Sequence, residues 1–259
     1  MKDNPYGFQP TEEQMANFHA MVHKQFSLEV SSYYPKTQQY LADTQNLQHW
    51  KQLAIQGIAD ISARLDEDNN KDLIINALPS LPLASFQAFA LCLENQVISK
   101  ALTQAIYYRL LLALKSLDAG NIQPAEFSQL CIISIRATAQ SEDRVLHKQL
   151  LLSILKSNIA QDIELLATIA TRCWQMLSEK ELLSLFLEAL ADTKNISQKQ
   201  QPEQQTAFNT MLYDLMFIPS MREPILKKFR SAQRSPKLTQ AIGYFFNQAT
   251  FKPNSSTRH

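Results

Sequence analysis

Apolar residues recur at intervals of three and four along most of the chain, which is the spacing of one face of an α-helix. The first such segment follows Thr11, where Met15, Phe18 and Val22 share one side of a predicted helix. Thr11 with Gln14 three residues later is the sequence of a capping box, so this helix should begin just after Thr11. The same spacing runs over about 44–65 and predicts one long helix there.

Helix start signals divide the rest of the chain. Asp68 precedes a short apolar segment that ends at Pro79, and it is expected to cap that helix. The stretches 178–181 (SEKE) and 220–223 (SMRE) are two further capping-box sequences. These signals predict a succession of helices joined by short turns.

Composition also favours an all-helical protein. Glycine accounts for 4 of 259 residues, against a usual share of about 7%, which argues against Gly-rich phosphate loops, tight hairpins and doubly wound nucleotide folds. Apolar residues make up 45% of the chain and charged residues 19%, so neither disorder nor a membrane protein is expected. No apolar run reaches the roughly 18 residues of a membrane helix, so we expect no membrane insertion.

The expected helices suggest a weak internal repeat. Leading helices are expected to begin at intervals of about 40 residues, which is typical of HEAT-like repeats of paired helices. We therefore predict an all-α fold of stacked antiparallel helix pairs, an irregular HEAT-like α-solenoid, with a closed helical bundle as the alternative. A single domain is expected over 1–251, with the polar loop 192–205 as a candidate subdomain break and 252–259 as a disordered tail.

Charge is distributed unevenly along the chain, although the net charge is only +1. Residues 222–259 contain eight basic residues and one acidic residue, with aromatic residues nearby. Such a stretch can bind an acidic protein surface or the phosphates of a nucleic acid, or it can be an ordinary solvated helix end. The candidate partner-binding residues are Lys227, Lys228, Arg230, Arg234 and Lys237.

Candidate chemistry is sparse. Cys92, Cys131 and Cys173 are widely spaced in apolar helical segments, which predicts three buried, reduced thiols and a cytoplasmic protein. His19 and His23 share a helical face and could together hold a metal. No acidic residue lies between them, so the zinc-protease motif is absent, and a third ligand would have to come from elsewhere. Two ordinary helix-surface histidines are therefore favoured. We expect no catalytic residue, no metal and no cofactor.

Two N-terminal stretches resemble a known family. They are residues 4–16 (NPYGFQPTEEQMA), followed by Phe18 and His19, and residues 50–60 (WKQLAIQGIAD) with 63–65 (ARL). These stretches resemble the bacterial family known as domain of unknown function 3549, over about the first 90 residues of the chain. Members of that family usually carry a further N-terminal region, which leaves the native start of this chain open. The resemblance implies no activity, ligand or catalytic residue.

The leading hypothesis is a non-catalytic helical module that binds a partner protein. The expected contact is a groove between the helices at 97–117 and 142–157, or the basic C-terminal end. A nucleic-acid-associated protein that uses the basic stretch 222–237 is the first alternative. An enzyme or a small-ligand carrier with a pocket between helices is the second alternative.

Overall fold

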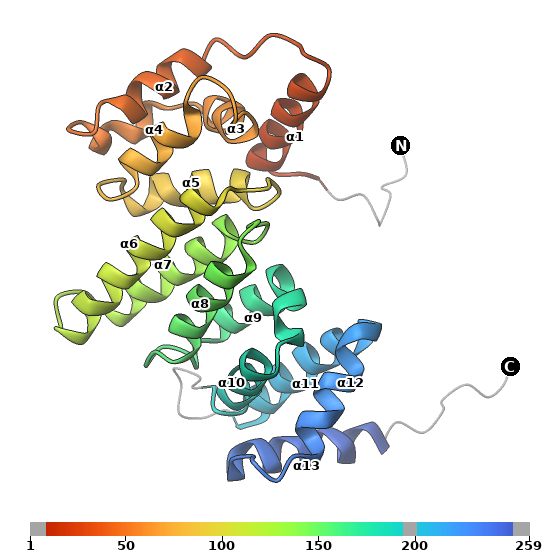
Figure 1. Ribbon diagram of the computed structural model, residues 1–259. Coiled ribbons are helices and arrows are strands. Elements are labelled where there is room, and N and C mark those ends of the chain that lie inside the picture. The colour runs from red at the N-terminus through yellow and green to blue at the C-terminus, as the bar shows by residue number, and fades with distance from the viewer. Residues whose placement is uncertain (1–8, 194–200, 251–259) are drawn as a thin grey trace, which may run out of the picture. The chain divides into compact units, whose positions relative to one another are not determined.

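The computed structural model describes residues 9–193 and 201–250, and this part of the chain is helical without a β-strand (Figure 1). The all-α prediction is confirmed for these residues. The expected tail at 252–259 lies outside them, as does the middle of the polar segment 192–205. Within the same residues, no helix combines the length and the apolar character that crossing a bilayer requires.

The chain divides into two compact units, which are described separately. The first unit contains the residues up to 122 together with 136–147, and the second contains 123–135 together with the residues from 148 onward. Two helices contribute residues to both units: α7 (Pro124–Ala137) and α8 (Arg144–Leu155). The solenoid and its alternative, the closed bundle, concern the arrangement of the units and stay predictions.

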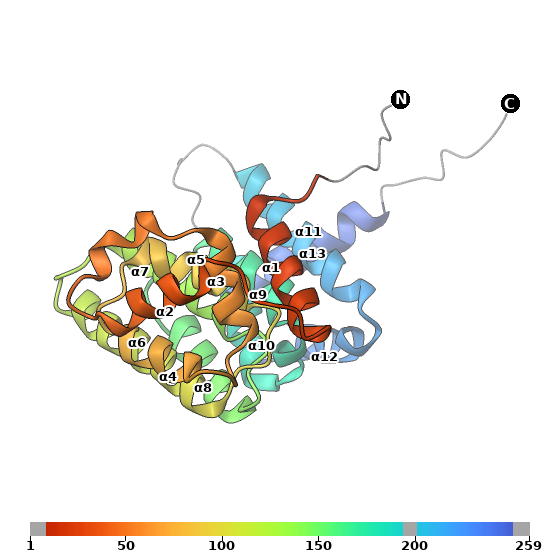
Figure 2. The same cartoon turned by 90° about the horizontal axis from the view of Figure 1, so that it is seen from above.

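The first unit is built around α3. Its helices are α1 (Glu12–Gln25), α2 (Tyr34–Ala42), the 3-10 helix η1 (Leu47–Gln52), α3 (Ile55–Ala63), α4 (Asn70–Ala77), α5 (Leu83–Leu93) and α6 (Lys100–Asp118). Helix α3 is buried along most of its length and contacts α1, α2 and α5 (Figure 1 and Figure 2). The largest fully buried side chains of this unit are Phe86, Phe89, Leu41, Leu47, Ile61, Ile74, Leu78, Leu81 and Leu93.

The single helix expected over 44–65 is wrong. The chain instead forms η1, passes through extended backbone at Leu53 and Ala54, and then starts α3. The break allows α3 to approach α2 at Gly57, where an added Cβ would lie 2.3 Å from the Thr37 Oγ1 atom. The Tyr40 hydroxyl donates a 2.6 Å hydrogen bond to the Leu47 carbonyl in η1. Packing between distant segments therefore overrides the local helical spacing.

Of the two helix caps predicted in the first unit, one is present and the other is absent. The capping box at Thr11 and Gln14 is confirmed, with both reciprocal hydrogen bonds present. The expected cap at Asp68 is wrong, because α4 starts after Asn69, which has a left-handed backbone with φ of 59°. The Asp68 carboxylate instead accepts a hydrogen bond from the Tyr34 hydroxyl at 2.9 Å. A long-range partner has taken the side chain that the local pattern assigned to a cap.

The second unit packs around α10. Its further helices are α9 (Ile163–Arg172), the 3-10 helix η2 (Trp174–Ser178), α10 (Lys180–Ala191), α11 (Gln201–Phe217), α12 (Pro219–Arg230) and α13 (Pro236–Thr250). Helix α10 contacts α9, η2, α11, α12 and α13. The largest fully buried side chains of the second unit are Phe127, Phe186 and Phe208.

Both capping boxes expected in the second unit are wrong. The Ser178 hydroxyl donates to the carbonyl of Gln175 and thereby ends η2, while α10 starts at Lys180 without a side-chain cap. Helix α12 starts earlier than expected, at Pro219, because proline suits the first turn of a helix. In the first case the Ser178 side chain bonds within η2 instead of capping α10. In the second case α12 begins before Ser220, so Ser220 cannot cap it.

Candidate functional site

The basic C-terminal residues are largely held by their own chain. The Lys228 ammonium group lies 3.0 Å from Glu188 Oε1 and 2.8 Å from Ser184 Oγ, both on α10. It also donates to the Gln233 carbonyl, and its side chain is only 11% exposed. Burial works to raise the pKa of Glu188, but hydrogen bonds from Ser235 and Lys228 outweigh burial and lower that pKa. Lys228 therefore attaches α12 to α10.

The other four predicted partner-binding residues lie around this contact. Lys237 pairs with Asp192 at the end of α10, and Lys227 lies 2.7 Å from Glu223 on α12 in a fully solvated pair. The Arg234 guanidinium donates to the backbone carbonyl of Phe229. Arg230 is exposed and has no partner among the described residues. The structure thus pairs the three lysines with acidic residues, whereas neither arginine pairs with an acidic residue among those the structure describes.

A larger surface feature lies on α1. This helix packs against α3 with its small side chains, since its buried residues are Ala16, Asn17 and Ala20. Its large apolar side chains are on the opposite side: Phe18 is 61% exposed, and Met15 and Met21 are each 40% exposed. An apolar helix stripe normally faces a core, so the exposure of this one makes it a candidate binding surface. We call Met15, Phe18 and Met21 the α1 apolar face.

The segment after α1 continues the same character. Phe26 and Leu28 are more than half exposed, and Val30 and Tyr33 follow them. Residues 15–33 thereby hold seven of the fifteen exposed large apolar side chains that the structure describes. Scattered apolar residues are normal on a protein surface, but such a concentration within one short region is not.

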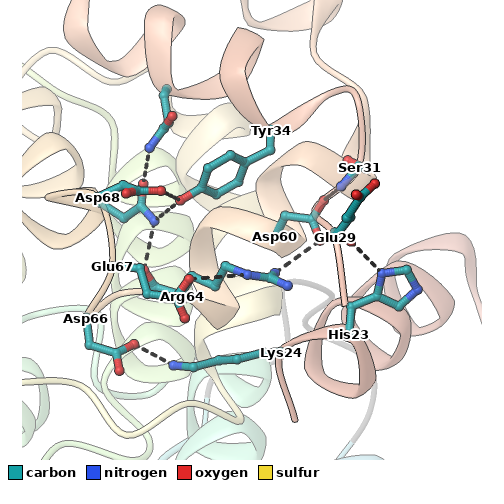
Figure 3. Close-up of polar contacts among 12 residues, drawn as sticks. His23, Lys24, Glu29, Ser31, Tyr34, Asp60, Arg64, Asp66, Glu67 and Asp68 are labelled. Carbon is teal, nitrogen blue, oxygen red and sulfur yellow. Dashed lines mark hydrogen bonds and ion pairs between the residues drawn. The ribbon is translucent and has the colours of Figure 1, made fainter. Parts of the chain in front are cut away.

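A buried polar network fixes this segment to the rest of the first unit (Figure 3). The Asp60 carboxylate accepts a 3.1 Å hydrogen bond from the Ser31 backbone amide and lies 3.5 Å from the Arg64 guanidinium. Both Asp60 and Arg64 are buried. At the end of α1, His23 Nδ1 donates to the carbonyl of Glu29 at 2.9 Å. The backbone groups of Glu29 and Ser31 therefore hold this segment in place.

The network continues into the loop that precedes α4 (Figure 3). The Asn70 side-chain amide donates to the Tyr34 hydroxyl at 2.7 Å and to the Arg64 carbonyl at 2.8 Å. Burial, with the neighbouring Asp68 carboxylate, raises the pKa of Tyr34 to about 12, so this hydroxyl stays protonated and can donate to Asp68. Lys24 of α1 pairs with Asp66 of the same loop. These contacts position the α1 apolar face relative to the rest of the first unit.

Reactive chemistry is not concentrated anywhere in the described residues. They contain no group of three or more His, Cys, Asp or Glu side chains suited to holding a metal. Cys92, Cys131 and Cys173 are free and buried, as predicted, and burial raises the pKa of each thiol well above its ordinary value. A thiol of this kind is a poor nucleophile at neutral pH.

Sequence reasoning did not identify the α1 apolar face as a site. The spacing of Met15, Phe18 and Val22 predicts the helix but does not say which side faces a core. The signal that could have found it is the pair Ala16 and Ala20, four residues apart, because small side chains allow the close approach of another helix. The groove expected between 97–117 and 142–157 involves residues of both units and stays a prediction.

Comparison with known proteins gives a family. The model of a family described as protein of unknown function (DUF3549) matches residues 1–246. The match extends well beyond the 90 or so residues over which the resemblance was expected. No curated protein and no solved structure matches the chain.

Proposed function

Since the chain belongs to the family of proteins of unknown function DUF3549, we propose a role from its own surface: a non-catalytic module that binds a partner protein through the α1 apolar face. The observation that carries the proposal is the orientation of α1. Its small residues pack on α3 while Met15, Phe18 and Met21 face solvent. A partner that covers these side chains removes apolar surface from water, which favours association.

Rigidity of the surface supports the same role. A preorganised surface loses less conformational entropy on binding than a mobile one. Helix α1 is fixed at its start by the Thr11 capping box and near its end by the Lys24–Asp66 pair. The following segment is fixed by the hydrogen bond from Ser31 to Asp60. The large apolar side chains are thus presented on a backbone that is already ordered.

The basic C-terminal stretch is the weaker candidate for the contact. Lys228 and Lys237 already pair with acidic residues of α10, which reduces the charge available to phosphate or to an acidic protein. We therefore favour the protein-binding role over the nucleic-acid alternative. The proposal also keeps the cytoplasm of a bacterium as the location, because three reduced thiols suit a reducing compartment. Stacked HEAT-like helix pairs remain part of the same proposal.

Site-specific photo-crosslinking in cells tests the function. A photoreactive amino acid in place of Phe18 should give a discrete covalent adduct, which mass spectrometry then identifies. The matched control places the same group at Tyr108, which is 60% exposed on α6 of the same unit. Substitution of Met15→Glu should abolish the adduct at position 18. Equal labelling at positions 18 and 108, or none at 18, would refute the proposal.

A further inference from the structure

We propose that the second unit binds a segment of a partner protein that carries acidic and large apolar side chains. The contact is made by exposed aromatic rings of α11 and α13 together with arginines of α12. This surface belongs to a different unit from the α1 apolar face, so the inference goes beyond the proposed function and does not depend on it. A single-stranded nucleic acid would be a different partner, and the experiment below distinguishes the two.

The exposed large apolar side chains of the second unit are all aromatic. Among the described residues they are Tyr213 and Phe217 of α11 and Tyr244 and Phe246 of α13. Phe217 is 76% exposed, the highest value among the fifteen exposed large apolar side chains that the structure describes. Tyrosine, phenylalanine and arginine are the residues that are enriched where proteins bind one another. The composition is therefore that of an interface centre rather than of scattered apolar residues.

Ring contacts give three of these side chains a common support. The Tyr213 ring lies 4.7 Å from the ring of Phe245, which lies 5.5 Å from the ring of Phe246. Phe246 in turn lies 6.1 Å from Phe229 of α12. Phe245 and Phe229 are buried, so the exposed rings rest on a packed aromatic base. Phe217 lies one helical turn beyond Tyr213 on the same side of α11. We call Tyr213, Phe217 and Phe246 the aromatic surface.

Two arginines of α12 lie on the side of this base that faces away from α10. Around the helix axis, Lys228 and Arg230 lie about 100° to opposite sides of Phe229. Arg222 lies about 20° from Phe229, on the same side as Arg230. Lys228 contacts α10 through Glu188, so both arginines lie away from that contact. They are eight residues apart, which separates them by about 12 Å along the helix.

Both guanidinium groups have donors to offer. The Arg222 Nε atom donates a 2.7 Å hydrogen bond to the carbonyl of Met216, the residue that precedes Phe217. Its terminal nitrogens have no hydrogen-bond partner in the part of the chain that the structure describes. Arg230 is exposed. A free guanidinium group binds a carboxylate through two parallel hydrogen bonds. Arg222 is thus fixed beside Phe217 with the appropriate end of its side chain available.

The charge balance favours an acidic partner. Residues 205–247 contain six basic and two acidic residues. The three lysines form ion pairs with Glu223, Glu188 and Asp192. Asp214 is then the remaining carboxylate of this range, against three arginines that form no ion pair with the described acidic residues. The surface therefore keeps an excess of positive charge, which is complementary to carboxylates.

The same observations favour a protein over a nucleic acid. A single strand needs cations along its whole phosphate backbone, but the lysines of this unit are already paired. Two arginines about 12 Å apart match carboxylates about four residues apart in an extended chain. We expect the bound segment to carry two acidic residues at about this spacing, with an aromatic or large aliphatic residue between them.

Selection from a display library of random short peptides tests the inference without assuming a sequence. The full-length chain is the target, and Arg222→Gln/Phe217→Ser is the counter-target, so that peptides bound elsewhere are removed. The enriched peptides should contain the expected acidic and apolar pattern. Fluorescence anisotropy then measures the affinity of an enriched peptide. Arg222→Gln/Arg230→Gln and Phe217→Ser should each weaken its binding by about tenfold or more.

Matched controls come from the same unit. Tyr244 is 50% exposed on α13, and its ring contacts none of the aromatic surface among the described residues. Tyr244→Ser should therefore bind the peptide like the wild type. Lys227→Gln removes a cation from a solvated pair on α12 and should also bind like the wild type. Far-UV circular dichroism and thermal melting confirm that every variant remains folded.

Three results would overturn the inference. The first is an absence of enriched peptides, or enrichment of peptides that lack acidic residues. The second is equal weakening by Phe217→Ser and Tyr244→Ser, or by the arginine and lysine variants. The third is tighter binding of single-stranded oligothymidine than of the enriched peptide, which would assign the surface to nucleic acid. Crosslinking at position 18 is unaffected by these results, so the proposed function stands or fails separately.

Discussion

His147 makes the stability of the first unit depend on pH in a window where carboxylates contribute little. The side chain lies in α8 with 3% of its surface exposed. Burial, and secondly the charge of Arg144, lowers the pKa of His147 from about 6.5 to about 4. The native state therefore holds a neutral imidazole, whereas the unfolded chain binds a proton as soon as the pH falls below about 6.5.

The size of the effect follows from the two pKa values. Between pH 6.5 and 4 the unfolded state holds the additional proton, so the free energy of unfolding falls as pH falls. Each pH unit in this range lowers the free energy of unfolding by about 1.4 kcal/mol, and the loss at pH 5 is about 2 kcal/mol relative to pH 8. The contribution of the neutral His147 to stability is fully present above pH 6.5 and is lost toward pH 4, because the pKa of this histidine is lower in the folded state than in the unfolded state.

Urea unfolding measured at several pH values tests this account. Trp50 lies in the first unit and Trp174 in the second, so a Trp174→Phe background makes the fluorescence report on the first unit. His147→Gln should remove most of the pH dependence between pH 7 and 5. His49→Gln is the control, because His49 is exposed. An unchanged slope in His147→Gln would show that the neutral buried imidazole does not control stability.

Three further substitutions test packing and pairing. Gly57→Ala should destabilise the chain by about 2 kcal/mol in urea unfolding, because the new Cβ would lie 2.3 Å from Thr37 Oγ1; equal or greater stability would contradict the close approach of α2 and α3. Arg109→Met should cost about 3 kcal/mol, since the guanidinium donates to two backbone carbonyls before α5; a loss below the experimental error would contradict this. Lys228→Met should lower stability by about 2 kcal/mol because it leaves the partly buried Glu188 carboxylate without its cation. The control Lys227→Met, in a solvated pair, should leave stability unchanged. Equal effects of the two substitutions would argue against the contact of Lys228 with α10.

The sequence predicts features that depend on neighbouring residues. The capping box at Thr11 involves residues three positions apart, so the start of α1 can be read directly from the chain. The helical class follows from composition and spacing for the same reason. The break before α3 cannot be read in this way, because it accompanies the approach of Gly57 to Thr37 in another helix.

Predictions about the candidate site have the same limit. The basic stretch is visible in the sequence, but Lys228 meets Glu188 at a separation of 40 residues. Only the folded chain shows that this charge is already paired. The orientation of α1 is also a tertiary property. Ala16 and Phe18 lie on different sides of the same regular helix, and packing against α3 decides which side is covered.

Three buried thiols give the molecule its own reporters of local opening. Cys92 belongs to the first unit, whereas Cys131 and Cys173 belong to the second. A thiol reagent can react with each cysteine only after the surrounding helices separate. The labelling rate of each cysteine, followed by peptide mass mapping, therefore measures how often its unit opens. The wild-type chain can thus show whether its two units open together or independently, without a fluorophore or an engineered probe.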